Sequence, residues 1–92
     1  MIRVDTLERK IKQIEGFNVR LLWPDGSDVR SDYVGAKSYR CIRAARDNWT
    51  VSRWIKERFK HSNPQFNVEV LDGIGNPVNG RTSLRTVRKW YH

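Results

Sequence analysis

Two segments of this chain alternate apolar and polar residues as a half-buried β-strand does, and each follows a segment with the apolar spacing of an amphipathic helix. From these patterns we expect helices over 6–15 and 51–60 and strands over 17–23 and 66–71. An Asp-Gly turn follows each strand. The order helix, strands, helix, strands predicts a single α+β domain of 92 residues, with two short amphipathic helices packed on a mainly antiparallel sheet of about four strands.

Both predicted helices carry signals at their ends. The stretch Asp5-Thr-Leu-Glu8 resembles a capping box, and Gly16 is suited to end the first helix. Asn48 or Thr50 is expected to cap the second helix, and the Asn-Pro pair at 63–64 is expected to end it.

The segment 38–46 fits two structures. As a strand it would place Arg40 and Arg46 on one face and Arg43 on the other, whereas as a helix it would place all three on one broad face. We favour a strand that runs into a turn. The strand after the first turn is expected to pass through Val29 and Tyr33 as an exposed edge.

The C-terminal segment 82–92 also leaves two structures open, a last strand or a short helix capped by Ser83. With either structure, two positions are open for Trp90 and Tyr91: they pack over the core, or they are exposed to solvent. The letters F-N-V open both predicted strands, which a duplicated helix–hairpin unit would explain. We favour a chance match, because F-N-V is a common strand opening and the turns read as different in length.

The charge of the chain is strongly positive. Eighteen Lys and Arg residues against ten Asp and Glu residues give a net charge of +8, and residues 37–92 hold this whole excess because residues 1–36 are neutral. Such an excess disfavours a compact state, and a polyanion such as nucleic acid relieves it. The single cysteine and the lack of an apolar targeting or membrane-spanning run lead us to expect a cytoplasmic protein.

We therefore expect a small basic protein that contacts the phosphates of DNA or RNA. The candidate residues on the second helix and the C-terminal segment are Arg53, Lys56, Lys60, Arg81, Arg85, Arg88 and Lys89. A second-rank set, whose direction depends on the structure of segment 38–46, consists of Arg40, Arg43 and Arg46. The alternative function is a non-enzymatic interaction module, an inhibitor or adaptor that binds an acidic protein surface. A basic surface that only aids solubility is the plainest explanation of the charge.

The stretch GNPVNGRT at 75–82 is one substitution away from the phosphate-binding P-loop pattern, because Arg81 stands where that pattern has lysine. Pro77 removes a backbone donor from the cradle, and too few residues follow for the remaining strands of such a fold. We interpret the stretch as two tight turns around a short edge segment.

Catalysis has little support in this sequence. Cys41 and His61 could pair as a nucleophile and a base, but a lone cysteine among apolar neighbours is typical of a core. One cysteine and two distant histidines do not match zinc-site spacings. The basic second helix is short for a membrane-surface helix, and its aromatic residues are needed in the core. We expect no enzyme activity, cofactor, metal or membrane partner.

Overall fold

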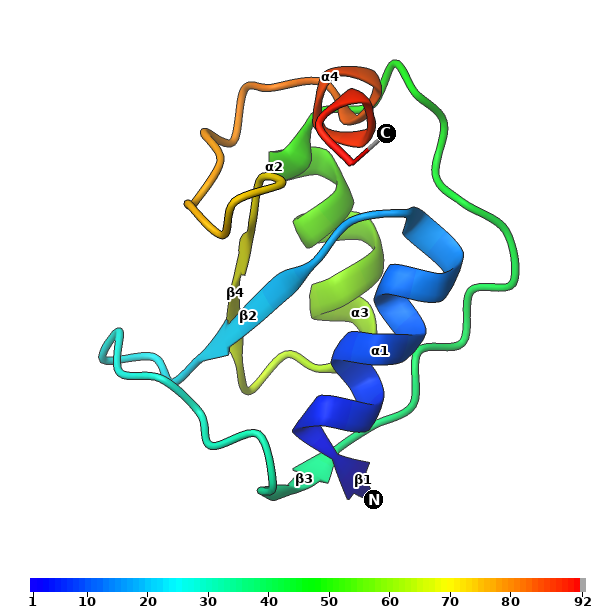
Figure 1. Ribbon diagram of the computed structural model, residues 1–92. Helices are drawn as coiled ribbons and strands as arrows, with labels where there is room; N and C mark the ends of the chain where they lie inside the picture. Colours follow the sequence, from blue (N-terminus) through cyan, green and yellow to red (C-terminus); the bar gives the residue numbers. More distant parts are fainter. Residues whose placement is uncertain (92) are drawn as a thin grey trace.

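The computed structural model describes residues 1–91 and confirms an α+β domain (Figure 1). Its helices are α1 (Val4–Glu15), a continuous helix over 51–62 and α4 (Leu84–Lys89). The helix over 51–62, which we call the central helix, consists of α2 (Val51–Trp54), the π-helical turn η1 (Ile55–Phe59) and α3 (Lys60–Ser62). The strands are β1 (Ile2–Arg3), β2 (Val19–Leu22), β3 (Val34–Ala36) and β4 (Asn67–Val70).

The four strands form two antiparallel pairs, β1 with β3 and β2 with β4. The expected strand after β2 is reduced to one bridge, between Leu22 and Asp28, because the chain then turns away to pass the N-terminus of α1. There the carbonyl groups of Ser31 and Tyr33 accept hydrogen bonds from the first two amides of α1. These carbonyls satisfy donors that a helix leaves unpaired, so the capping box expected at 5–8 was wrong.

The central helix begins and ends close to the predicted residues. The hydroxyl of Thr50 accepts a hydrogen bond from the amide of Arg53 at 3.2 Å, which confirms one of the two expected caps. The helix widens into a π-helical turn at η1, which adds about one residue to that turn and rotates every later side chain around the axis. A regular helical period therefore misplaces residues after Phe59.

A helix–strand–turn unit occurs twice, over 4–29 and 51–78, with equivalent strand and turn residues 49 positions apart. The bridges that close the two turns are Leu22–Asp28 and Leu71–Pro77, and the turn glycines with positive φ are Gly26 (+91°) and Gly75 (+90°). The turns are thus equal in length. Our expectation that the two turns differ in length was wrong.

The pairing of β2 with β4 relates the two units by a local two-fold axis. Arg20 lies opposite Glu69, which is its own equivalent in the second unit, and the two side chains form an ion pair of 2.6 Å. An antiparallel pair in which equivalent residues face each other is what a two-fold axis through that residue pair produces.

The core lies between the helices and the β2–β4 pair, which Figure 1 shows along one flank of the helices. The ring of Trp54 is fully buried there and meets Phe17 edge-on at 5.0 Å between centroids. Leu7 and Ile11 of α1 are also fully buried. One side of each amphipathic helix is thereby removed from water.

Two of the open alternatives are decided by the structure. Segment 38–46 has no regular secondary structure, so the expected strand was wrong. The C-terminal segment forms the helix α4, capped by Ser83 through its side chain. Trp90 is exposed, whereas Tyr91 is half-buried with its hydroxyl bonded to backbone carbonyl groups just after β4.

Candidate functional site

Residues 37–49, which we call the strap, lead from β3 to the cap of the central helix without regular secondary structure. Figure 1 shows the strap, in green, running along the outside of the molecule beside α1. A loop of this length inside a compact domain is uncommon, and most such loops are either functional or disordered. The backbone of the strap is ordered by hydrogen bonds to side chains elsewhere in the chain. Three of these side chains lie on helices, and the fourth is Asn63, just after the central helix.

Asn63 and Arg58 fix the first part of the strap. The fully buried Asn63 accepts a hydrogen bond from the amide of Lys37 at 2.7 Å and donates one to the carbonyl of the same residue at 3.0 Å. The guanidinium of Arg58 donates to the carbonyl of Arg43 at 2.5 Å. Each bond takes the place of a partner that a helix or sheet would have supplied.

The carboxylate of Glu15 fixes the second part of the strap. Its side chain is completely buried and accepts hydrogen bonds from the amide of Ala45 at 2.9 Å and the hydroxyl of Tyr39 at 2.5 Å. It also pairs with Arg58 at 2.8 Å and with Arg88 at 3.0 Å. We call these groups the Glu15 clamp. It joins α1, the strap, the central helix and α4 at one buried point.

Burial and hydrogen bonding change the pKa values of two groups of the clamp, Tyr39 and Arg58. Burial, together with the hydrogen bond to Glu15, raises the pKa of Tyr39 well above its usual value, so the phenol remains a donor. Burial opposes the charge of Arg58, but hydrogen bonds to Tyr39 and Glu15 outweigh it and raise the pKa of this guanidinium. Tyr39 therefore remains protonated and Arg58 remains charged at neutral pH.

The outer side of the strap is lined by cations. Every third residue is basic and exposed, namely Lys37, Arg40, Arg43 and Arg46, and no acidic residue lies between the first and the last. None of the four forms an ion pair within residues 1–91. Ala36, Tyr39 and Ala45 are buried, whereas Ile42, at the same spacing, is exposed. The second-rank arginines are all exposed on the strap, and Lys37, which sequence reasoning missed, extends the set.

Two residues of the first-rank set lie in internal contacts. Arg88 is part of the Glu15 clamp, with only 15% of its side chain exposed. Lys60 donates to the carbonyl of Phe66 at 2.5 Å and to Asn67 at 2.7 Å. The expected basic face of the central helix is therefore broken, because the π-helical turn directs Lys60 towards β4.

The other first-rank residues are exposed but scattered. Arg53 pairs with Glu57 at 2.7 Å and lies over the ring of Trp49, while Lys56 is exposed on the next turn. Arg81 is exposed in the loop between β4 and α4, where the carbonyls of the flanking Gly80 and Thr82 accept hydrogen bonds from the first two amides of the central helix. Arg85 and Lys89 are exposed on α4.

The strap and α4 adjoin, so their cations form one surface. The amide of Arg85 donates to the carbonyl of Asp47 at 3.1 Å, and that of Leu84 donates to Trp49 at 2.8 Å. Arg88 donates to the carbonyl of Ala45 at 2.9 Å. The basic surface thus runs along the strap and continues onto the start of α4.

The distribution of charge follows the repeated unit. The two units, 4–29 and 51–78, together contain eight basic and eight acidic residues. The segments outside them, 30–50 and 79–92, contain nine basic and two acidic residues. The net charge of the chain is therefore carried almost entirely by the strap, its flanks and the C-terminal segment.

The stretch over 75–82 forms the two turns that its sequence predicts. The Asp72 carboxylate accepts hydrogen bonds from the amides of Ile74 and Asn76, each at 2.9 Å. The Asn79 side chain accepts one from the amide of Arg81 at 2.8 Å. Amides that a P-loop would direct at a phosphate are thus bonded within the turns.

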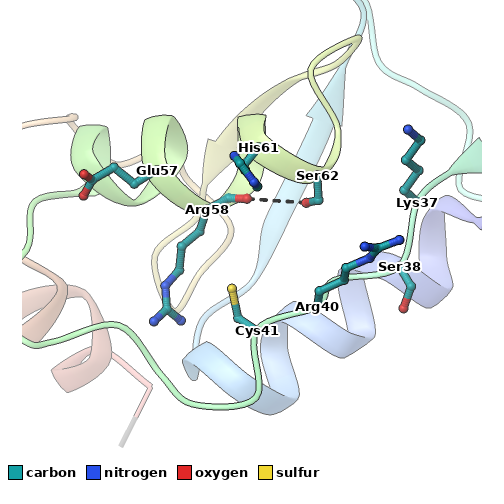
Figure 2. A pocket seen from close by; sticks show the side chains of 8 residues that line it. All are labelled: Lys37, Ser38, Arg40, Cys41, Glu57, Arg58, His61 and Ser62. Atoms are coloured by element: carbon teal, nitrogen blue, oxygen red, sulfur yellow. Dashed lines mark hydrogen bonds between the residues drawn. The ribbon is translucent and has the colours of Figure 1, made fainter.

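Cys41 and His61 lie on opposite sides of a hollow beside the strap (Figure 2). Within residues 1–91, no group of three or more His, Cys, Asp or Glu side chains is arranged to hold a metal ion. In the same part of the chain, every helix is too short or too polar to cross a bilayer.

Comparisons with protein-family models, with curated proteins and with solved structures find no match to this chain. The case for a function therefore depends on the geometry and charge of the strap.

Proposed function

We propose that this protein binds nucleic acid through the strap and the adjoining start of α4. The observation that carries the proposal is the confinement of the net positive charge to the segments outside a neutral repeated frame. A charge that only aided solubility would have no reason to gather on one ordered surface. Lysine and arginine side chains that neutralise phosphates release counterions, which supplies affinity for DNA or RNA of any sequence.

The order of the strap favours binding. The Glu15 clamp and Asn63 hold its backbone before any partner arrives, so little backbone entropy is lost on binding. Of the two aromatic residues on the strap, Tyr39 is buried and Trp49 lies against Arg53 and Arg58. Neither ring is presented for stacking on bases. The proposed contacts are therefore with phosphates, from Lys37, Arg40, Arg43, Arg46 and Arg85 on this surface, and carry no sequence preference.

The test is a titration of duplex DNA, single-stranded DNA and RNA of equal length, each at several salt concentrations. Five contacts, four from the strap and one from Arg85, predict a slope of log affinity against log salt of roughly −4.5 for duplex DNA and −3.5 for a single strand. The variant Arg43→Gln with Arg46→Gln is expected to lose roughly two fifths of that slope. Arg81→Gln, which removes one cation outside the strap and α4, is the control. Binding that is absent at low salt, or that is the same in the double variant, would contradict the proposal.

One observation favours a second function, capture of an acidic protein surface. Ile42 lies between Arg40 and Arg43 with 88% of its surface exposed, and an apolar residue beside arginines suits a protein interface better than a phosphate backbone. The variant Ile42→Ser distinguishes the two functions. Nucleic-acid affinity is expected to be unchanged, whereas a protein interface centred on Ile42 would be weakened.

A further inference from the structure

A hollow of about 230 Å³ lies between the first residues of the strap and the end of the central helix (Figure 2). The strap contributes Lys37, Arg40 and Cys41 to it, and the helix contributes Glu57, Arg58 and His61. Figure 2 shows Lys37 and Arg40 across the hollow from His61. Here the basic surface is concave, between the strap and the central helix.

The hollow carries uncompensated positive charge. Two charged groups that line the hollow already form ion pairs: Arg58 with Glu15 at 2.8 Å, and Glu57 with Arg53 at 2.7 Å. Lys37 and Arg40, by contrast, form no ion pair in the described part of the chain. An anion that enters would therefore meet two cations without displacing an existing ion pair. The imidazole of His61 offers a further hydrogen-bonding group.

The size and the lining of the hollow limit what it can hold. Pockets for whole drug-sized molecules measure roughly 300–1,000 Å³ and are lined largely by apolar and aromatic side chains. This hollow is smaller, and no Phe, Tyr or Trp side chain is among the described residues that line it. It suits a compact, highly charged group and not a nucleobase.

We infer that the hollow binds the terminal phosphate monoester of a nucleic-acid strand, an inference that rests on the proposed function and names its preferred substrate. A phosphodiester within a strand has two free oxygens and two sugar linkages, both of which would have to leave the hollow. A monoester has a single linkage, three free oxygens and a charge of about −1.5 to −2 at neutral pH. The position of the hollow at one end of the strap lets the remaining strand follow Arg43 and Arg46.

The test compares four forms of one short single-stranded oligonucleotide by fluorescence anisotropy, with a 5′-phosphate, a 3′-phosphate, both, or neither. The wild-type protein is expected to bind a phosphorylated form roughly threefold to fivefold more tightly than the unmodified form, the range that half-exposed ion pairs supply. Arg40→Gln is expected to abolish this preference. Arg46→Gln, a strap variant with the same change in charge outside the hollow, should weaken all forms equally and keep the preference.

The affinities for the four forms distinguish the terminal-phosphate site from general binding by the strap. Equal affinity of the wild-type protein for all four forms would overturn the terminal-phosphate site and leave binding by the strap intact. If no form binds, an NMR titration with inorganic phosphate tests the hollow alone. Saturable shifts of the amides of Cys41 and His61, lost in Arg40→Gln, would support an anion site there. Their absence would overturn it.

Discussion

Replacing Glu15 by glutamine tests whether the clamp determines the stability of the domain. The glutamine side chain has nearly the same shape, so the change opens no cavity. It removes the only carboxylate that faces both Arg58 and Arg88 within the clamp. It also places an amide donor among groups that already donate to this position, including the amide of Ala45.

The expected loss of stability is large for a single isosteric change. Removing one partner of a buried ion pair leaves an uncompensated charge, here on Arg58, and costs about 3–5 kcal/mol, whereas Arg88 keeps an ion pair with Asp47 at 2.7 Å. For a domain of this size, 1 kcal/mol corresponds to about 4–8 °C in melting temperature, so a 3 kcal/mol loss lowers it by roughly 12–24 °C. Glu57→Gln is the control, because its ion pair with Arg53 is exposed and contributes about 0.3–0.5 kcal/mol.

The assay is urea unfolding followed by tryptophan fluorescence, with hydrogen exchange of the Ala45 amide as a local probe. We expect Glu15→Gln to lower the midpoint strongly and to speed exchange at Ala45, and Glu57→Gln to do neither. A loss below about 1 kcal/mol for Glu15→Gln, with exchange at Ala45 unchanged, would refute the view that the carboxylate holds the strap.

Three further predictions address other contacts. Lys60→Met should lose roughly 1–3 kcal/mol in urea unfolding, because the lysine bonds two groups at the start of β4, while nucleic-acid affinity changes little. Stability should fall as the pH rises above about 10, since a raised pKa in the folded state means that the fold retains the phenolic proton of Tyr39; tyrosinate absorbance should rise together with unfolding. Exchanging Arg20 and Glu69 should lower the melting temperature only slightly, because the two side chains still face each other and only the exposed contact of Arg20 with Asp28 is lost, whereas Arg20→Glu alone should lower it more.

The sequence predicts the elements whose structure depends on nearby residues. The apolar stripe of the central helix, the alternation in β2 and β4, and the glycine turns are all local patterns, and each element forms within a few residues of its expected place. The repeated unit was also visible in principle. Gly26 and Gly75 follow the F-N-V openings at the same distance, and counting that distance would have shown equal turns.

The strap could not be predicted, because its partners are distant in the sequence. Its backbone is bonded by Glu15, Asn63 and Arg88, which lie tens of residues away on either side. One local signal was available. Glu15 lies four residues after Ile11 on the apolar side of α1, and a carboxylate at a buried helical position needs cationic partners. A buried Glu15 therefore predicts that at least one arginine or lysine side chain is buried beside it, as Arg58 and Arg88 are.

The irregular form of the strap has a physical consequence for binding. A strand over 38–46 would direct Arg43 to the opposite face from Arg40 and Arg46, so that the three could not meet one polyanion together. A helix would satisfy its own backbone and leave the Ala45 amide unavailable to Glu15. By replacing backbone pairing with buried side chains, the chain keeps Tyr39 and Ala45 inward and every third side chain, all of them basic, outward. The buried charges of the clamp and the exposed charges of the strap are thus two parts of one arrangement, and weakening the first should weaken binding by the second.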